Sequence, residues 1–291
     1  MTKEVFNEAS GAEVYPLAVS FAHIDVGAER PFSVLHISDT HLTEAFDDEE
    51  EPIRLFAAKR AVTFCGRQWE ALEASVDFAS RFADMIVNTG DLIDFASEGN
   101  MAAVRKFYEI AGDNVVFAPG NHEWQWRGED NNSYSERAIG MCRDTYPCDL
   151  SFSSRVLNGV NFIAMDNSVA NVAGRPGITE AQVEAFAGEV AKGLPIVLCL
   201  HVPIYTPDVW KTYYQYWRNR ECRYADGFPT EPPQMNGITD DFIAYLKTEP
   251  LLKAILSGHE HYSLDERFSP TATQFLVAGN YAGAVRHLLI T

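Results

Sequence analysis

The sequence is short of three features: long apolar runs, paired cysteines and positive charge. Its 291 residues contain no stretch of 18 uninterrupted apolar residues, which argues against a membrane span. The first residues, MTKEVFNEASGAEVYP, lack the apolar centre of a secretory signal peptide. The five cysteines (65, 142, 148, 199 and 222) include no C-x-x-C pair, so we expect reduced thiols. Together these absences predict a cytoplasmic protein; only an oxidising compartment would favour a disulfide between Cys142 and Cys148.

The shortage of positive charge restricts the partners. Lysine and arginine number 23 against 41 aspartates and glutamates, for a formal net charge of -18. A nucleic-acid binder usually carries a basic face that offsets phosphate repulsion, so this balance argues against DNA or RNA as a partner. An anionic substrate would need a local positive centre, which a metal could supply.

The length fits one large domain or two small ones, and a hydrophobic fraction of 46% is ordinary for a globular protein. Short apolar runs alternate with amphipathic stretches. The apolar runs have no polar face and are typical of strands in a covered sheet. We predict strands at 32–38, 84–89, 114–118, 161–165, 195–200, 253–257 and 273–278.

The amphipathic stretches predict helices at 67–82, 99–111, 133–144, 179–192 and 238–248. Thr179 and Thr239 are typical helix starts. The turn AGNYAGA near the chain end favours an antiparallel pair of strands on either side of it. The alternation of strand and helix predicts an α/β fold, and from strand order alone a single sheet with helices outside.

Two segments do not fit this alternation. EAFDDEEE at 44–51 is read as a solvated acidic loop rather than an accessory metal site. Residues 203–237 form a long, aromatic-rich insertion that we expect to be irregular. A loop of that length in a compact domain is more often functional than idle. It could be a lid, a wall of the substrate site or an oligomer contact.

Polar motifs follow five of the predicted strands. They are D-T-H at 39–41, G-D-L-I-D at 90–94, G-N-H-E at 120–123, H at 201 and G-H-E-H at 258–261. Ligands of layered α/β folds gather at the carboxyl ends of strands, where residues far apart in the sequence converge. Five of the eight histidines lie in these motifs. A common site explains this distribution better than separate structural roles do.

The residue types indicate metal binding. Mixed nitrogen and oxygen donors suit manganese, iron or zinc, whereas magnesium and calcium prefer oxygen alone. A tetrahedral site takes about four ligands, so seven candidates fit two ions about 3.5–4 Å apart, bridged by a carboxylate. The seven candidates are Asp39, His41, Asp91, Asn121, His201, His259 and His261.

The five motifs, in this order, resemble those of the calcineurin-like metallophosphoesterases. The resemblance runs from Asp39 to His261. It implies a first metal held by Asp39, His41, Asp91 and His261, and a second held by Asp91, Asn121, His201 and His259. It also implies that His122 faces the substrate and protonates the leaving oxygen, and that Asp94 orients His122 and favours its charged form.

The resemblance further implies the family's four-layer α/β sandwich: two packed mixed sheets with helices on both outer faces, here as a single domain over residues 1–291. The activity implied is hydrolysis of a phosphoester by a hydroxide that bridges two metal ions. The acidic surface favours a small phosphomonoester or phosphodiester, nucleotide-like in character because aromatic residues of the insertion could stack on a base. Candidate substrate contacts are Arg127, Trp210, Tyr214 and Arg218.

Two other functions are compatible with the motifs. A serine/threonine protein phosphatase has similar motifs, although the insertion suits a small ligand better. Some relatives of this fold serve as non-catalytic scaffolds, but here the ligand set and His122 are intact. For the aromatic residues of the insertion, packing of the segment onto the body is the alternative to base stacking.

Overall fold

The computed structural model describes residues 16–129, 131, 134–168, 177–220 and 237–291. Its helices are α1 (Glu51–Thr63), α2 (Gln68–Phe82), α3 (Glu98–Ala111), α4 (Glu136–Thr145), α5 (Glu180–Val190), α6 (Pro207–Arg220), α7 (Gly237–Leu246) and the 3-10 helix η3 (Asn280–Ala282). Its strands are β1 (Ala18–Ile24), β2 (Phe32–Ile37), β3 (Met85–Asn88), β4 (Val115–Phe117), β5 (Phe152–Leu157), β6 (Val160–Met165), β7 (Ile196–Cys199), β8 (Leu252–Ser257), β9 (Leu264–Arg267), β10 (Thr273–Leu276) and β11 (Ala284–Ile290).

The strands form two mixed sheets. The first has five strands in the order β1-β11-β2-β3-β4, and the second has six in the order β5-β6-β7-β8-β10-β9. Within the first sheet β2, β3 and β4 run parallel, and within the second β6, β7 and β8 run parallel. Their carboxyl ends therefore deliver consecutive loops to one end of each sheet.

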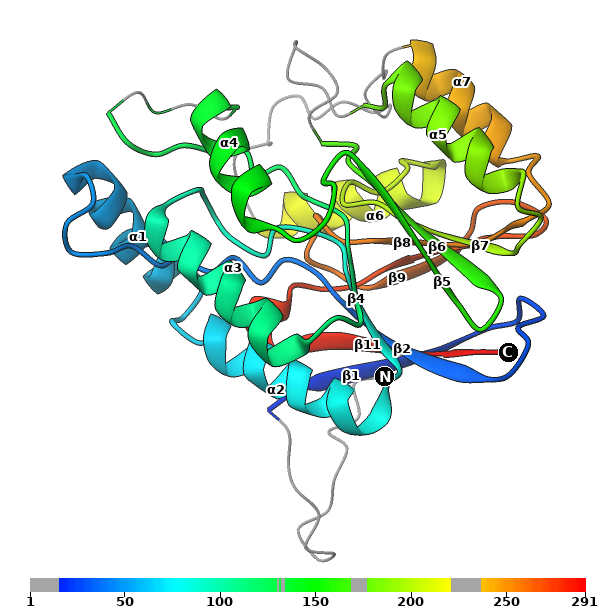
Figure 1. Ribbon diagram of the computed structural model, residues 1–291, viewed down its shortest axis with the longest axis horizontal. Helices are drawn as coiled ribbons and strands as arrows, with labels where there is room; N and C mark the ends of the chain where they lie inside the picture. Colours follow the sequence, from blue (N-terminus) through cyan, green and yellow to red (C-terminus); the bar gives the residue numbers. More distant parts are fainter. Residues whose placement is uncertain (1–15, 130, 132–133, 169–176, 221–236) are drawn as a thin grey trace, which may run out of the picture.

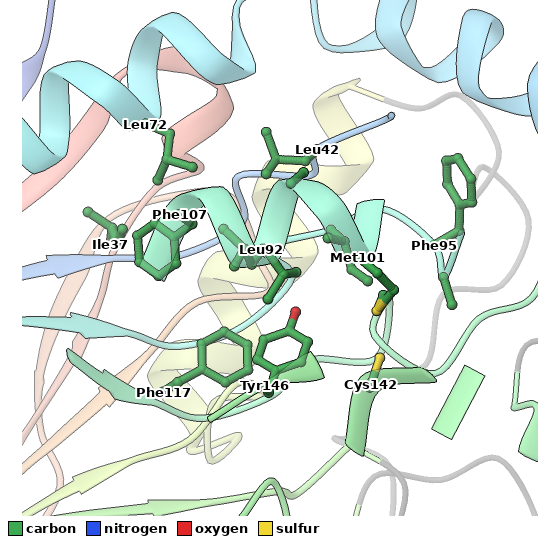
Figure 2. Close-up of a cluster of buried hydrophobic side chains, with 14 of the residues drawn as sticks. Ile37, Leu42, Leu72, Leu92, Phe95, Met101, Phe107, Phe117, Cys142 and Tyr146 are labelled. Carbon is green, nitrogen blue, oxygen red and sulfur yellow. The ribbon is translucent and has the colours of Figure 1, made fainter. Parts of the chain in front are cut away.

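Three apolar layers hold the sheets and helices together. One cluster lies between the first sheet and helices α1 to α4 and contains the side chains in Figure 2, among them Ile37, Leu72 and Phe107. A second lies between the two sheets, with Val34, Phe162 and other residues of both. A third joins the second sheet to α5 and α7 (Figure 1). This is the four-layer α/β arrangement that the family resemblance implies, and the single sheet expected from strand order alone is wrong.

Each of the seven predicted strands and five predicted helices has a counterpart, but other elements were not predicted. Strands β1, β5 and β9 were missed, as was helix α1. The expected antiparallel pair at the chain end is wrong. Strand β10 pairs with β8 and β9 in one sheet, while β11 pairs with β1 and β2 in the other. Thr179 caps α5 through Gln182, whereas Thr239 lies inside α7.

The insertion at 203–237 is not irregular throughout, because Pro207–Arg220 forms helix α6. Residues 221–236 lie outside the described part, as do residues 1–15, so a single domain over the whole chain stays a prediction. No helix in the described ranges is long and apolar enough to cross a membrane. Cys142 and Cys148 are both free thiols.

The acidic loop at 44–51 ties α3 to the body of the protein. The Glu49 carboxylate accepts hydrogen bonds from the backbone N–H groups of Glu98 and Gly99, at 2.8 and 3.1 Å, in the first turn of α3. Glu50 accepts one from the backbone N–H of Glu129 at 3.0 Å. These two carboxylates therefore have structural roles, in a segment that the sequence led us to expect to be a solvated loop.

Candidate metal centre

The five polar motifs follow β2, β3, β4, β7 and β8, so each sheet contributes loops from adjacent parallel strands. Hydrogen bonds join the loops within each sheet, as between Asp39 N–H and the Gly90 carbonyl at 2.9 Å. Other contacts join the two sheets, such as the one in which the backbone N–H of His259 lies 3.1 and 2.9 Å from the two Asp39 carboxylate oxygens. The motifs thus form one site across both sheets.

The backbone at this site is strained in a repeated way. Among the described residues, seven that are not glycine have positive φ angles, and five of them are predicted ligands. These five are Asp39, His41, Asp91, His259 and His261, with φ between 49° and 68°. Side chains disfavour this left-handed region, and such strain concentrates at functional sites. The five residues follow β2, β3 and β8, so three of the five motifs share this backbone conformation.

The first group of side chains consists of Asp39, His41 and His261. Asp39 Oδ1 lies 3.8 Å from His41 Nε2 and 3.2 Å from His261 Nε2. The two histidine nitrogens lie 3.1 Å apart. All three ligand atoms lie within 4.8 Å of one another, a spacing at which one ion can contact all of them.

The second group consists of Asp91, His201 and His259. Asp91 Oδ2 lies 3.2 Å from His201 Nε2, and His201 Nε2 lies 3.1 Å from His259 Nδ1. The same Asp91 oxygen lies 3.7 Å from His41 Nε2, which belongs to the first group. Asp91 therefore stands between the two groups, as a bridging carboxylate would.

The side chain of Asn121 lacks a partner at its oxygen. Asn121 Oδ1 is buried and makes no hydrogen bond with any other described residue. A buried carbonyl oxygen without a partner costs about 1–3 kcal/mol, so such an atom requires an explanation. A cation at the second group would provide the missing partner.

The ring orientations also fit metal ions. His41 Nδ1 lies 2.9 Å from the Asp94 carboxylate and His201 Nδ1 lies 2.7 Å from the Thr89 carbonyl, so both Nδ1 atoms are donors. The opposite nitrogens of the neutral rings are then acceptors, and they face other acceptors at 3.1 to 3.8 Å. Acceptor atoms that converge in this way repel one another unless a positive charge lies among them. In metal-binding histidines, the ring nitrogen that does not bind the metal typically donates a hydrogen bond that fixes the orientation of the ring. The residues present fit a pair of metal ions.

The electrostatics point in the same direction. Burial opposes ionisation, yet the neighbouring histidines hold the pKa of Asp39 and Asp91 well below the ordinary range. Burial also opposes charge on His201, but Asp91 raises its pKa to about 10. The position of His201 Nε2 therefore favours a positive charge, whether a proton or a metal ion supplies it.

His122 lies at the edge of both groups with a fifth of its side chain exposed. Its Nδ1 lies 2.7 Å from the Asp94 carbonyl oxygen and 3.1 Å from Asp94 Oδ1, and its Nε2 lies 3.9 Å from Asp91 Oδ2. Burial lowers its pKa, but Asp91 and Asp94 outweigh this and raise it to about 9. The predicted pairing of Asp94 with His122 is thus present, although the backbone carbonyl makes the shorter contact.

The carboxylate of Asp94 has two further partners. His41 Nδ1 is one, and Arg60 is the other, through Nε to Oδ2 at 2.6 Å and Nη2 to Oδ1 at 2.8 Å. Sequence reasoning missed Arg60 because it lies on α1, in a stretch without a recognisable motif. The only signal was its helical spacing from Phe56 and Phe64, four residues on either side.

Glu123, the last residue of the G-N-H-E motif, is fully buried beneath the site. Its carboxylate accepts hydrogen bonds from the backbone N–H groups of Gly120 at 2.7 Å, Asp91 at 3.0 Å and Leu92 at 2.9 Å. Burial raises its pKa to about 7. Glu123 therefore joins the β3 and β4 loops and does not face the metal groups.

The four candidate substrate contacts have different surroundings in the structure. Arg127 is partly buried, donates to Asn131 at 2.9 Å and to Gln125, and lies 5.1 Å from the Phe56 ring centre. Trp210 is 9% exposed, and its ring stacks on that of Tyr213, another residue of the insertion, with ring centres 5.0 Å apart. Tyr214 is partly buried on α6, and the side chain of Arg218 lies outside the described part.

Comparison with known proteins agrees with the geometry. The chain resembles a solved dimetal phosphatase from Danio rerio with a TM-score of 0.52 and 12% identity, over 88% of this chain and 91% of that one. A solved putative 5'-nucleotidase from Staphylococcus aureus matches with a TM-score of 0.47 and 13% identity. The match covers 86% of this chain and 49% of that one. No curated protein matched the sequence. The model of the calcineurin-like phosphoesterases matches residues 32–263, so the chain belongs to this family.

Proposed function

We propose that the protein hydrolyses a small-molecule phosphomonoester or phosphodiester at a dinuclear metal site. The family and its chemistry make it a hydrolase of phosphoester bonds. The dinuclear site is supported above all by Asp91, whose Oδ2 lies 3.2 Å from His201 Nε2 and 3.7 Å from His41 Nε2. One carboxylate within reach of both groups suits two ions better than one.

In this proposal the seven predicted ligands hold two ions of manganese, iron or zinc. When bound, such ions acidify water and neutralise charge on the phosphoryl oxygens. His122 would donate a proton to the leaving oxygen through Nε2, since Asp94 holds its Nδ1. A pKa raised to about 9 in the metal-free protein supports the protonated form near neutral pH.

Charge supports a small substrate. The formal net charge of -18 repels polyanions at long range, so a nucleic acid is disfavoured. Near the site, the guanidinium carbons of Arg60 and Arg127 lie 5.9 and 5.1 Å from the centre of the Phe56 ring, so both side chains supply local positive charge. The similarity in fold to a dimetal phosphatase is compatible with this substrate class.

A nucleotide-like substrate is the favoured subclass, and the aromatic insertion is the reason. Tyr214, which is partly buried on α6, is a candidate stacking residue of the insertion. A protein phosphatase acting on phosphoserine or phosphothreonine is the alternative, with the same metal groups and a larger substrate.

The test combines metal analysis with a substrate panel. Purified protein should contain two metal ions per chain and hydrolyse aryl phosphate mono- or diesters when manganese is added. Nucleoside monophosphates, cyclic nucleotides and a phosphopeptide then separate the substrate classes. A protein with no metal and no turnover on any of these would overturn the proposal. Turnover of the phosphopeptide alone would favour the protein phosphatase.

A further inference from the structure

Arg60 belongs to none of the five motifs, yet its guanidinium contacts the residue that joins His41 to His122. Its Nε and Nη2 donate to the two different oxygens of Asp94 at 2.6 and 2.8 Å. A two-pronged pair of this kind fixes both the position and the plane of a carboxylate. Asp94 is fully buried, and only a quarter of the Arg60 side chain is exposed.

Two aromatic rings, one on α1 and one on the residue directly after it, lie close to the Arg60 guanidinium. Phe56 and Phe64 lie four residues before and after it, and its guanidinium carbon lies 5.9 and 4.7 Å from their ring centres. Phe64 also stacks on the His41 ring at 4.6 Å with an interplanar angle of 11°. The arginine and the metal-facing histidine therefore share one aromatic support.

The orientation of Asp94 matters because two imidazole rings depend on one of its oxygens. Oδ1 lies 2.9 Å from His41 Nδ1 and 3.1 Å from His122 Nδ1. The torsion that rotates a carboxylate about its last bond is broad and weakly restrained. Without the guanidinium, Oδ1 can leave the position where both rings meet it, whereas His122 keeps the carbonyl of Asp94 at 2.7 Å as a second partner.

We propose that Arg60 is a positioning residue that locks the Asp94 carboxylate and so orients His41 toward the first metal ion. The inference rests on the proposed dinuclear site. It predicts an asymmetry: losing Arg60 should weaken the first metal position, which contains His41, and leave the second unaffected. Residues that orient metal ligands typically change metal affinity or activity 10- to 100-fold when removed.

Calorimetric titration of chelator-stripped protein with manganese tests the inference. In an Asn121→Ala background, in which the first ion alone should bind, Arg60→Ala is expected to weaken manganese binding about 10- to 100-fold. Arg54→Ala is the matched control, since Arg54 is exposed on the same helix and donates to the Glu49 carbonyl. Added guanidinium should partly restore the affinity of Arg60→Ala but not alter the control.

Arg60→Lys and Arg60→Gln keep the inference testable if Arg60→Ala does not fold. Lysine keeps the charge without the planar fork, so Arg60→Lys should recover less than half of the lost affinity. Unchanged manganese affinity in folded Arg60→Gln and Arg60→Lys would overturn the positioning role. Failure of the unaltered protein to bind manganese would instead overturn the proposed dinuclear site, so the two failures are distinguishable.

Discussion

At the scale of single residues, Asn121 and His122 are neighbours with opposite surroundings. Asn121 Oδ1 is buried without a hydrogen-bond partner among the described residues. His122 has its Nδ1 occupied by Asp94 and a partly exposed ring. A ring nitrogen of His122 also lies within 4.8 Å of ligand atoms of His41 and Asp91, a spacing at which His122 could itself hold an ion. Separate substitutions therefore distinguish a ligand from a proton donor.

We expect His122→Ala to keep two metal ions and to lose turnover by about 10²- to 10⁴-fold, the usual contribution of a general acid. Asn121→Ala should lose one ion, because the orphaned oxygen is its contact with that ion. Elemental analysis and steady-state rates on an aryl phosphate measure both effects. If His122→Ala emptied a metal position, the proton-donor assignment would be wrong.

A pH profile tests the link between Asp94 and His122. The carboxylate of Asp94 and the charge of Asp91 raise the pKa of His122, and a proton donor is active only below its pKa. Activity should therefore fall as pH rises through the pKa that His122 has in the metal-loaded enzyme. In Asp94→Asn the pKa of His122 should fall, so the alkaline limb of the rate profile should move to lower pH. An alkaline limb at the original pH would contradict the link.

At the scale of elements, short loops after the strands position the ligands, and glycine makes their close approach possible. A Cβ atom on Gly258 would collide with the side chains of Ser38 and Asp39 from the opposite sheet. The backbone N–H of His259, one residue later, donates to Asp39. The contact between the β2 and β8 loops depends on the absence of a side chain at Gly258.

Gly258→Ala should therefore abolish binding of at least one metal ion, because Asp39 would have to move. Gly188→Ala is the matched control: Gly188 is exposed on α5 with no atom within 4 Å of the added Cβ. It should bind metal normally and gain about 0.5–1 kcal/mol of stability, the cost of glycine in a helix. Metal content and urea unfolding of both variants provide the comparison; normal metal content in Gly258→Ala would contradict this account of the loop.

The sequence predicted central strands far better than edge strands. The missed strands β1, β5 and β9 all lie at sheet edges. Their residues alternate between partly buried and exposed, so they lack the uninterrupted apolar runs by which β2 or β6 was recognised. The chain end was misread for another reason: β10 and β11 are neighbours in sequence, but η3 leads the chain from one sheet to the other.

The sequence motifs also indicated residues that the structure brings close together, and for a physical reason. A motif such as G-N-H-E contains both the glycine of a tight turn and the candidate ligand that follows it. Asn121 can therefore be recognised as a candidate ligand from the sequence alone. Arg60 and the short contact between His122 and the Asp94 carbonyl are not recorded in this way. They depend on how α1 and the β3 loop pack in space, which no local pattern encodes.

At the scale of the whole molecule, the candidate metal centre is formed by loops of both sheets, and its charged side chains are largely buried. Without metal, the raised pKa of His201, about 10 against an ordinary 6.5, means that the folded state retains a proton that the unfolded state releases. That stabilisation is fully present below pH 6.5 and is lost as pH rises toward 10.

Chelated protein should accordingly lose stability between pH 6.5 and 8.5, by up to about 1.4 kcal/mol per pH unit for each retained proton. His201→Gln should reduce this slope, whereas His23→Gln, at an exposed position, should not. Added manganese should raise the free energy of unfolding at each pH, since it binds the folded state. Urea unfolding with a chelator at two pH values measures the slope, and an identical slope in His201→Gln would contradict the charge argument.

The central claim is that Asp91 bridges two metal ions. A crystal of the protein soaked with manganese, measured for anomalous scattering, tests it most directly. The account predicts two peaks about 3.5–4 Å apart, one beside Asp39, His41 and His261 and the other beside Asn121, His201 and His259, with Asp91 between them. A single peak, or peaks away from Asp91, would contradict it.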